Sequence, residues 1–273
     1  MAKSTTDKLF ENLRVRVLSA LVLAPLYFAA IYIGSPYFDL IIFIACGLMT
    51  WEWVRVCSGN VFGLWGGAMG ISLIVPTFML YLGLSQLALA ALVILAGSSF
   101  FVARVCGDRN PTFLVIGTIL IGTFIITSLW IRNLPVLGRE VTIWLVLGVW
   151  FADVGGYFFG RLIGGPKMAP RISPNKTWAG LGGGMLLALV WSEVWLYWVG
   201  GHKFGIVIAL GVGVASLAQL GDLSISVVKR HFGVKDAGRI IPGHGGVLDR
   251  FDGLLVVTPA AAFVFFWWGN WWI

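Results

Sequence analysis

The sequence predicts an all-α polytopic integral membrane protein, with about nine transmembrane helices and a polar site on the cytoplasmic side. Hydrophobic residues make up 59% of the chain and charged residues only 11%, whereas a soluble domain has roughly 25% charged residues. The mean hydropathy is +0.91. The apolar runs are too many for a soluble domain with one anchor, and a β-barrel would show short segments of alternating polarity instead.

The apolar runs define the expected spans and a division of the chain. They cover residues 15–33, 37–56, 61–80, 84–105, 112–131, 141–163, 177–199, 204–228 and 253–272. The first run is long for a signal-peptide core and lacks a clear cleavage site, so we interpret it as a span. We expect an N-terminal transmembrane region, 1–140, with about five spans, and a C-terminal region, 141–273, with about four. The second region contains the longer polar loops, 164–176 and 229–252.

The positive charges predict the orientation. With the N-terminus in the cytoplasm, 16 of the 19 lysines and arginines lie on the cytoplasmic side, and only Arg132, Arg139 and Lys203 lie outside. This arrangement satisfies the positive-inside rule and makes both long polar loops cytoplasmic. The net charge of +7 is therefore attributed to topology and anionic headgroups, and no nucleic-acid partner is expected.

The segment 219–252 concentrates charge in an apolar chain. One helical face carries residues at intervals of three or four: Gln219, Asp222, Ser226 and Lys229. The polar residues that follow are Arg230, Lys235, Asp236, His244, Asp249, Arg250 and Asp252, with a glycine cluster at Gly243, Gly245 and Gly246. Charge near hydrocarbon is costly and usually reflects function. Basic residues interleaved with aspartates and glycines suit phosphates bound together with a divalent metal. A solvated connector would explain the basic residues but not the aspartates.

A second polar segment runs from residue 152 to residue 180. Asp153 lies well inside a span, and it could pair with Lys176 or Lys229 or help to hold a metal. Glycines beside it permit close helix packing. Further along, Ser173 can cap the next helix, and a helix start with Lys176 and Thr177 suits an anion.

Two glutamates also lie in apolar surroundings. Glu52 is one turn from Arg55, and we interpret the two as a local pair at the cytoplasmic boundary. Glu193 has no nearby partner in the sequence. Neither glutamate is assigned to catalysis.

Both polar segments resemble the motifs of the phosphatidate cytidylyltransferases, also called CDP-diacylglycerol synthases. The matching residues are Ser226, Lys229-Arg230, Lys235-Asp236, Pro242, His244-Gly245-Gly246, Asp249-Arg250 and Asp252. The family's Ser-Pro-x-Lys-Thr motif matches residues 173–177. The chain departs from the family pattern at Ile225 and Ala179, where an acidic residue is often found. The resemblance covers 153–252; the first five spans match only in being apolar.

The resemblance implies a membrane nucleotidyltransferase of phospholipid biosynthesis that makes CDP-diacylglycerol and pyrophosphate from CTP and phosphatidate. The implied catalytic residues are Asp222, Asp249, Lys235, Asp236 and Lys176. The implied substrate-binding residues are Ser173, Asn175, Thr177, Ser226, Lys229, Arg230, His244, Gly245, Gly246, Arg250 and Asp153. The expected metal is Mg²⁺ on Asp222, Asp249 and Asp252, with a second cation left open, because hard oxygen ligands favour it.

Two alternatives remain open at this point. A cation-coupled transporter with ion sites at Asp153 and Asp222 would need a polar path to both faces, whereas the polar residues cluster on one side. The second alternative is another CTP-using lipid enzyme, such as a polyprenol kinase. The complete motif spacing from Lys235 to Asp252 argues against it. The expected partners are CTP, phosphatidate and membrane lipids, and a homodimer is left open. The expected location is a bacterial inner membrane.

Overall fold

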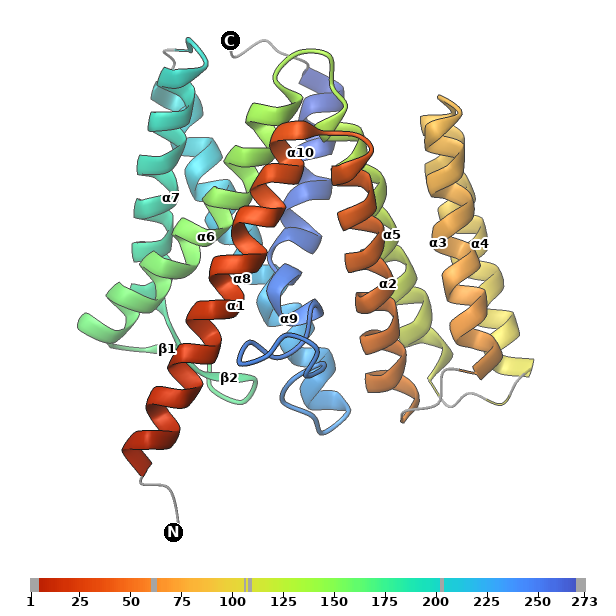
Figure 1. Ribbon diagram of the computed structural model, residues 1–273, viewed down its shortest axis with the longest axis horizontal. Helices are drawn as coiled ribbons and strands as arrows, with labels where there is room; N and C mark the ends of the chain where they lie inside the picture. Colours follow the sequence, from red (N-terminus) through yellow and green to blue (C-terminus); the bar gives the residue numbers. More distant parts are fainter. Residues whose placement is uncertain (1–4, 60–62, 106, 108–109, 202–203, 269–273) are drawn as a thin grey trace.

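The structure is a computed structural model that describes residues 5–59, 63–105, 107, 110–201 and 204–268. Long helices dominate these residues and run side by side as a bundle (Figure 1). The helices are α1 (Thr5–Ile33), α2 (Tyr37–Ser58), α3 (Gly63–Tyr81), α4 (Ser85–Val105), α5 (Pro111–Arg132), α6 (Gly138–Leu162), α7 (Trp178–Trp198), α8 (Phe204–His231), α9 (Leu248–Phe251) and α10 (Leu254–Trp268). Two short strands, β1 (Lys167–Ala169) and β2 (Ser173–Thr177), pair antiparallel between α6 and α7.

The length and composition of the helices confirm a polytopic membrane protein. Within the described ranges, seven helices are long and apolar enough to cross a membrane, namely those of α1, α2, α4, α5, α6, α7 and α8. The apolar parts of α3 and α10 are shorter, Gly66–Tyr81 and Leu254–Trp267. Each expected span thus corresponds to a helix, while nine crossings stay a prediction.

The helices α6 and α7 pack closely because glycines line their contact. A Cβ on Gly180 would lie 2.8 Å from the carbonyl oxygen of Gly156, and one on Gly184 would lie 2.7 Å from that of Ala152. A side chain at either position would force the two backbones apart. The close packing expected of Gly156 and Gly160 is confirmed, but the same expectation for Gly164 is wrong, because a Cβ there would meet nothing within 4 Å.

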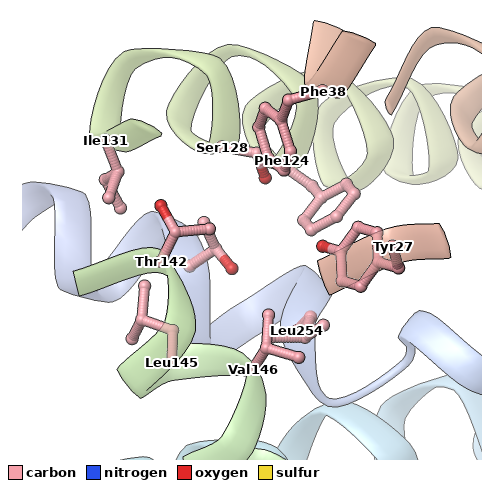
Figure 2. Close-up of a pocket in the computed structure, with 10 residues that line it drawn as sticks. Tyr27, Phe38, Phe124, Ser128, Ile131, Thr142, Leu145, Val146 and Leu254 are labelled. Carbon is pink, nitrogen blue, oxygen red and sulfur yellow. The ribbon is translucent and has the colours of Figure 1, made fainter. Parts of the chain in front are cut away.

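One hydrophobic core joins the two halves of the chain. It extends from Ala30 to Phe265 and includes the fully buried Trp53 of α2 and Phe124 of α5. A small cavity of about 10 Å³ lies in this core between α1, α2, α5, α6 and α10, and Figure 2 shows hydroxyl groups around it. Because its volume is about that of one water molecule, the cavity cannot hold a nucleotide or a lipid headgroup.

The polar segments gather at one end of the bundle. The hairpin β1–β2, the loop before α9 and the start of α1 lie at the same end, and α10 finishes at the opposite end (Figure 1). The hairpin α3–α4 stands at the side of the bundle, where large apolar side chains such as Leu64 and Ile94 are exposed. Such an apolar perimeter is suited to lipid, and the polar end is where chemistry in water is possible.

Candidate active site at the polar end of the bundle

Asp222 and Lys176 form the first ion pair of the site. Asp222 lies on α8, and its Oδ2 atom pairs with Nζ of Lys176 from β2. Its other oxygen accepts a hydrogen bond of 3.3 Å from Ser226, one turn further along α8. The predicted polar face of α8 therefore turns toward the hairpin, and it is joined there to the second polar segment of the sequence.

Asp249 and Lys229 form a second and more buried pair. Lys229 Nζ lies 2.6 Å from Asp249 Oδ1, and the two side chains are only 11% and 7% exposed. Asp249 Oδ2 accepts hydrogen bonds from the backbone N–H groups of Ala237, at 3.0 Å, and Gly246, at 3.2 Å. Because both carboxylate oxygens are engaged, Asp249 is fixed against the end of α8.

Asp153 and Asp252 extend the negative charge between these pairs. The carboxylate of Asp153 interacts electrostatically with Asp222, Lys176 and Arg250. Burial, and then the negative charges of Asp222 and Asp153, raise the pKa of Asp252 to about 8, although its carboxylate accepts a 2.8 Å hydrogen bond from the Gly253 N–H. Four aspartates from α6, α8 and the α9 region thus surround two lysines. Of the roles left open for Asp153, the structure shows an electrostatic interaction with Lys176, whose ion pair is with Asp222.

The cluster is held together by lysines and backbone groups. Across the described residues, no three His, Cys, Asp or Glu side chains are arranged as a ready metal centre. The ammonium groups of Lys176 and Lys229 instead neutralise Asp222 and Asp249. The donor set consists of oxygen atoms, which suits a hard divalent cation better than zinc.

The start of α7 differs from the prediction. Ser173 does not cap this helix, because residues 173–177 are extended and pair with β1. Thr177 is the N-cap instead, and its hydroxyl accepts a 3.0 Å hydrogen bond from the Gly180 N–H. Lys176 therefore precedes the helix on a strand. Asn175 is exposed on the same strand.

Other predicted site residues lie around the cluster. Arg230 donates hydrogen bonds to the carbonyl oxygens of Ile172 and Val234, so it ties the end of α8 to the hairpin. Lys235, Asp236 and Arg250 are exposed at the same end. All of these side chains lie within the polar end, but Lys235 and Asp236 stand outside the paired core.

The glycine-rich turn, residues 242–246, contacts α1. Gly243 and Gly245 have φ values of +75° and +86°, which an L side chain rarely adopts. His244 Nδ1 lies 2.9 Å from the hydroxyl of Ser19, which also donates a hydrogen bond to the Pro242 carbonyl oxygen. Gly246 gives its N–H to Asp249. The turn thus serves to place Asp249, and a serine of the first helix supports it.

Glu52 is the polar residue whose position the sequence least suggests. It is fully buried, at 0% exposure, and its carboxylate accepts hydrogen bonds from the Val247 and Leu248 N–H groups. An acidic residue within an apolar helix is a recognisable signal, but a partner 195 residues away in the sequence is not. The pairing expected with Arg55 is therefore not the main role of Glu52.

The chain is similar to known proteins over most of its length. Residues 14–268 match the profile of the cytidylyltransferase family. A protein named phosphatidate cytidylyltransferase from Brucella suis biovar 1 (strain 1330) is 34% identical over 259 residues, which is 93% of each chain. Proteins of the same name from Haemophilus influenzae and Bacillus subtilis (strain 168) are 30% and 31% identical to this chain. The aligned part is 93% of this chain in both cases, and 99% and 97% of the two relatives. The likeness extends through the N-terminal helices as well.

Proposed function

This chain belongs to the cytidylyltransferase family, and from that premise we propose that the polar end of its bundle is the active site. The protein is a membrane nucleotidyltransferase that makes CDP-diacylglycerol and pyrophosphate from CTP and phosphatidate. An oxygen of the phosphatidate phosphate attacks the α-phosphorus of CTP, and the bond from that phosphorus to the β-phosphate oxygen breaks. Because the attacking oxygen is already anionic, the transfer requires positioning and charge neutralisation more than a general base.

The two lysine–aspartate pairs are the observation that carries the proposed site. Lys176 and Lys229 come from different elements and place two ammonium groups beside Asp222 and Asp249. Ammonium groups bind phosphate oxygens through charge-assisted hydrogen bonds. We expect them, together with Lys235, Arg230 and Arg250, to contact the triphosphate of CTP and the phosphate of the lipid. The remaining predicted substrate-binding residues are proposed to shape the same site. They are Ser173, Asn175, Thr177, Ser226, His244, Gly245 and Gly246.

The aspartates are the proposed ligands of Mg²⁺, with a second cation left open. Asp222 and Asp153 both interact electrostatically with Asp252, so several carboxylates lie near one another at this end of the bundle. Asp222, Asp249 and Asp252 therefore fit a divalent cation with oxygen ligands. When bound, Mg²⁺ polarises the α-phosphate and reduces the repulsion between two anionic substrates. We propose that Asp153 and the exposed Asp236 contribute negative charge around the site.

The proposed orientation places this site in the cytoplasm. If α3 and α10 cross the membrane with the seven longer helices, the N-terminus is cytoplasmic and the C-terminus lies outside. CTP then enters from the cytosol, while the acyl chains of phosphatidate remain in the lipid. The relatives named above are bacterial, so we place the protein in a bacterial inner membrane. A homodimer remains an open expectation.

Purified protein assayed with CTP and a choice of lipid acceptors tests this function. We expect release of pyrophosphate with phosphatidate and none with diacylglycerol, which has no phosphate to attack the α-phosphorus. Formation of CDP and phosphorylated diacylglycerol would indicate a lipid kinase. Ion transport without nucleotide turnover would indicate a transporter, although the gathering of the paired aspartates and lysines in one cluster argues against it.

A further inference from the structure

Glu52 is a carboxylate buried in a helix that carries none of the active-site motifs. Its side chain, on α2, is 0% exposed. Oε1 accepts a hydrogen bond of 3.0 Å from the Val247 N–H, and Oε2 accepts one of 2.8 Å from the Leu248 N–H. A buried carboxylate is costly unless its oxygens are hydrogen-bonded. Two donors, one for each oxygen, call for a carboxylate, because a glutamine offers only one acceptor oxygen.

Two glycines make the space for this carboxylate. A Cβ on Gly238 would collide with Oε1 of Glu52, and one on Gly246 would lie 2.7 Å from Oε2. Contacts this short cannot form without displacing the glutamate. The backbone of the loop therefore lies on more than one side of the Glu52 carboxylate. Glu52 is thus enclosed by the loop that precedes α9, and it does not merely touch the loop at its edge.

The same loop segments also hold Asp249. The N–H groups of Ala237 and Gly246 donate to Asp249 Oδ2, and each of these residues is next to one that contacts Glu52. Glu52 therefore binds the loop at 247 and 248 and lies against 238 and 246, while Asp249 binds it at 237 and 246. If Glu52 moved, the backbone donors that orient Asp249 would move with it.

We propose that Glu52 is a positioning residue for the nucleotidyl transfer, which fixes the loop so that Asp249 keeps its place beside Lys229. This inference rests on the proposed role of Asp249 as a metal ligand. The N-terminal half of the chain thereby takes part in building the active site, because α2 provides Glu52, which accepts two hydrogen bonds from backbone N–H groups of the loop. A glutamate that only stabilises the fold would not influence the affinity for the metal.

The test compares Glu52→Gln with Glu193→Gln, which makes the same change at an exposed position of α7. Glu52→Gln keeps the volume but turns one acceptor oxygen into a donor that faces an N–H group. In metal-free protein, we expect faster hydrogen exchange of the amides at 237–249 in Glu52→Gln only. We also expect its half-saturating Mg²⁺ concentration to rise, or its kcat per folded enzyme to fall, by about 10- to 100-fold, as for residues that orient metal ligands.

The remaining outcomes separate this inference from the proposed function. Wild-type exchange, or wild-type kcat together with wild-type Mg²⁺ dependence, in folded Glu52→Gln would overturn the positioning role. If Glu52→Gln does not fold, Gly238→Ala replaces it, because this change keeps the carboxylate but displaces it, and the same shift is expected. An active Asp249→Asn enzyme would refute the role of Asp249, and the inference with it. An inactive Asp249→Asn enzyme beside an unchanged Glu52→Gln enzyme would refute the inference alone.

Discussion

Lys229 Nζ lies 2.6 Å from Asp249 Oδ1, and this contact joins the last turn of α8 to the short helix α9. Both side chains are largely buried, so neither charge is well hydrated on its own. Removal of one member of such a pair leaves an uncompensated charge, which costs about 3–5 kcal/mol. The pair is therefore both a structural clamp and the site of the proposed chemistry.

Replacement of the paired aspartates should abolish turnover. Asp249→Asn and Asp222→Asn keep the volume of the side chain but remove the charge that a cation needs. We expect kcat per folded enzyme to fall about 10²–10³-fold, as for other electrostatic groups in active sites. The rate should be normalised to folded protein, because Asp249→Asn also leaves Lys229 unpaired. Activity above roughly a tenth of wild type would make direct metal ligation untenable.

Lys176 should matter far more than another cation at the same end of the bundle. Lys176→Gln removes the partner of Asp222, whereas Arg104→Gln removes an exposed charge from the last turn of α4. One charged hydrogen bond to phosphate is worth roughly 1.5–3 kcal/mol. We therefore expect a large loss of kcat/KM for CTP in Lys176→Gln and little change in Arg104→Gln. Equal and mild losses would mean that Lys176 serves only membrane topology.

The glycine contact between α6 and α7 predicts a contrast between two neighbouring positions. A Cβ on Gly184 would press on the Ala152 carbonyl oxygen at 2.7 Å, whereas one on Gly182 would meet nothing within 4 Å. Gly184→Ala should destabilise the protein by about 1–3 kcal/mol, the usual cost of overpacking. Gly182→Ala should leave it unchanged or slightly more stable. Thermal unfolding in detergent measures both, and similar Tm values would contradict the packing.

The sequence predicts features that depend on local patterns. Apolar runs identified the helices, and the spacing of Asp222, Ser226 and Lys229 identified the polar face of α8. The motif residues also indicated which loops meet, because the resemblance supplied their shared chemistry. Ion pairs such as Lys176–Asp222 remained open in the sequence, since several lysines were suitable partners for each aspartate.

The features that the sequence missed depend on contacts between distant segments. Ser173 and Thr177 are both plausible helix caps, and the choice between them depends on the strand pairing with β1. Glu52 was visible as an acid in an apolar helix, but its donors lie on a loop almost 200 residues later. Gly246 was expected to belong to a phosphate-binding cluster, and Gly238 was not singled out, whereas both lie against the Glu52 carboxylate.

Cysteine labelling tests the proposed orientation. In a background without Cys46, Cys57 and Cys106, we expect Arg171→Cys, in the hairpin, to react with a membrane-impermeant reagent only from the cytoplasmic side. Val136 is exposed in the connection between α5 and α6, which lies at the opposite end of the bundle (Figure 1), and Val136→Cys should react only from outside. The reverse pattern would place the site on the wrong side for cytosolic CTP, and labelling of both positions from one side would contradict the span count.

The fate of the individual phosphates of CTP tests the central claim most directly. Purified protein is given phosphatidate with CTP labelled at either the α- or the γ-phosphate, and the lipid and aqueous products are separated. We predict that the α-label enters the lipid as part of a CDP-lipid and that the γ-label leaves as pyrophosphate, with neither event in Asp249→Asn. Transfer of the γ-label to lipid, or unchanged incorporation of the α-label by Asp249→Asn, would contradict nucleotidyl transfer at this site.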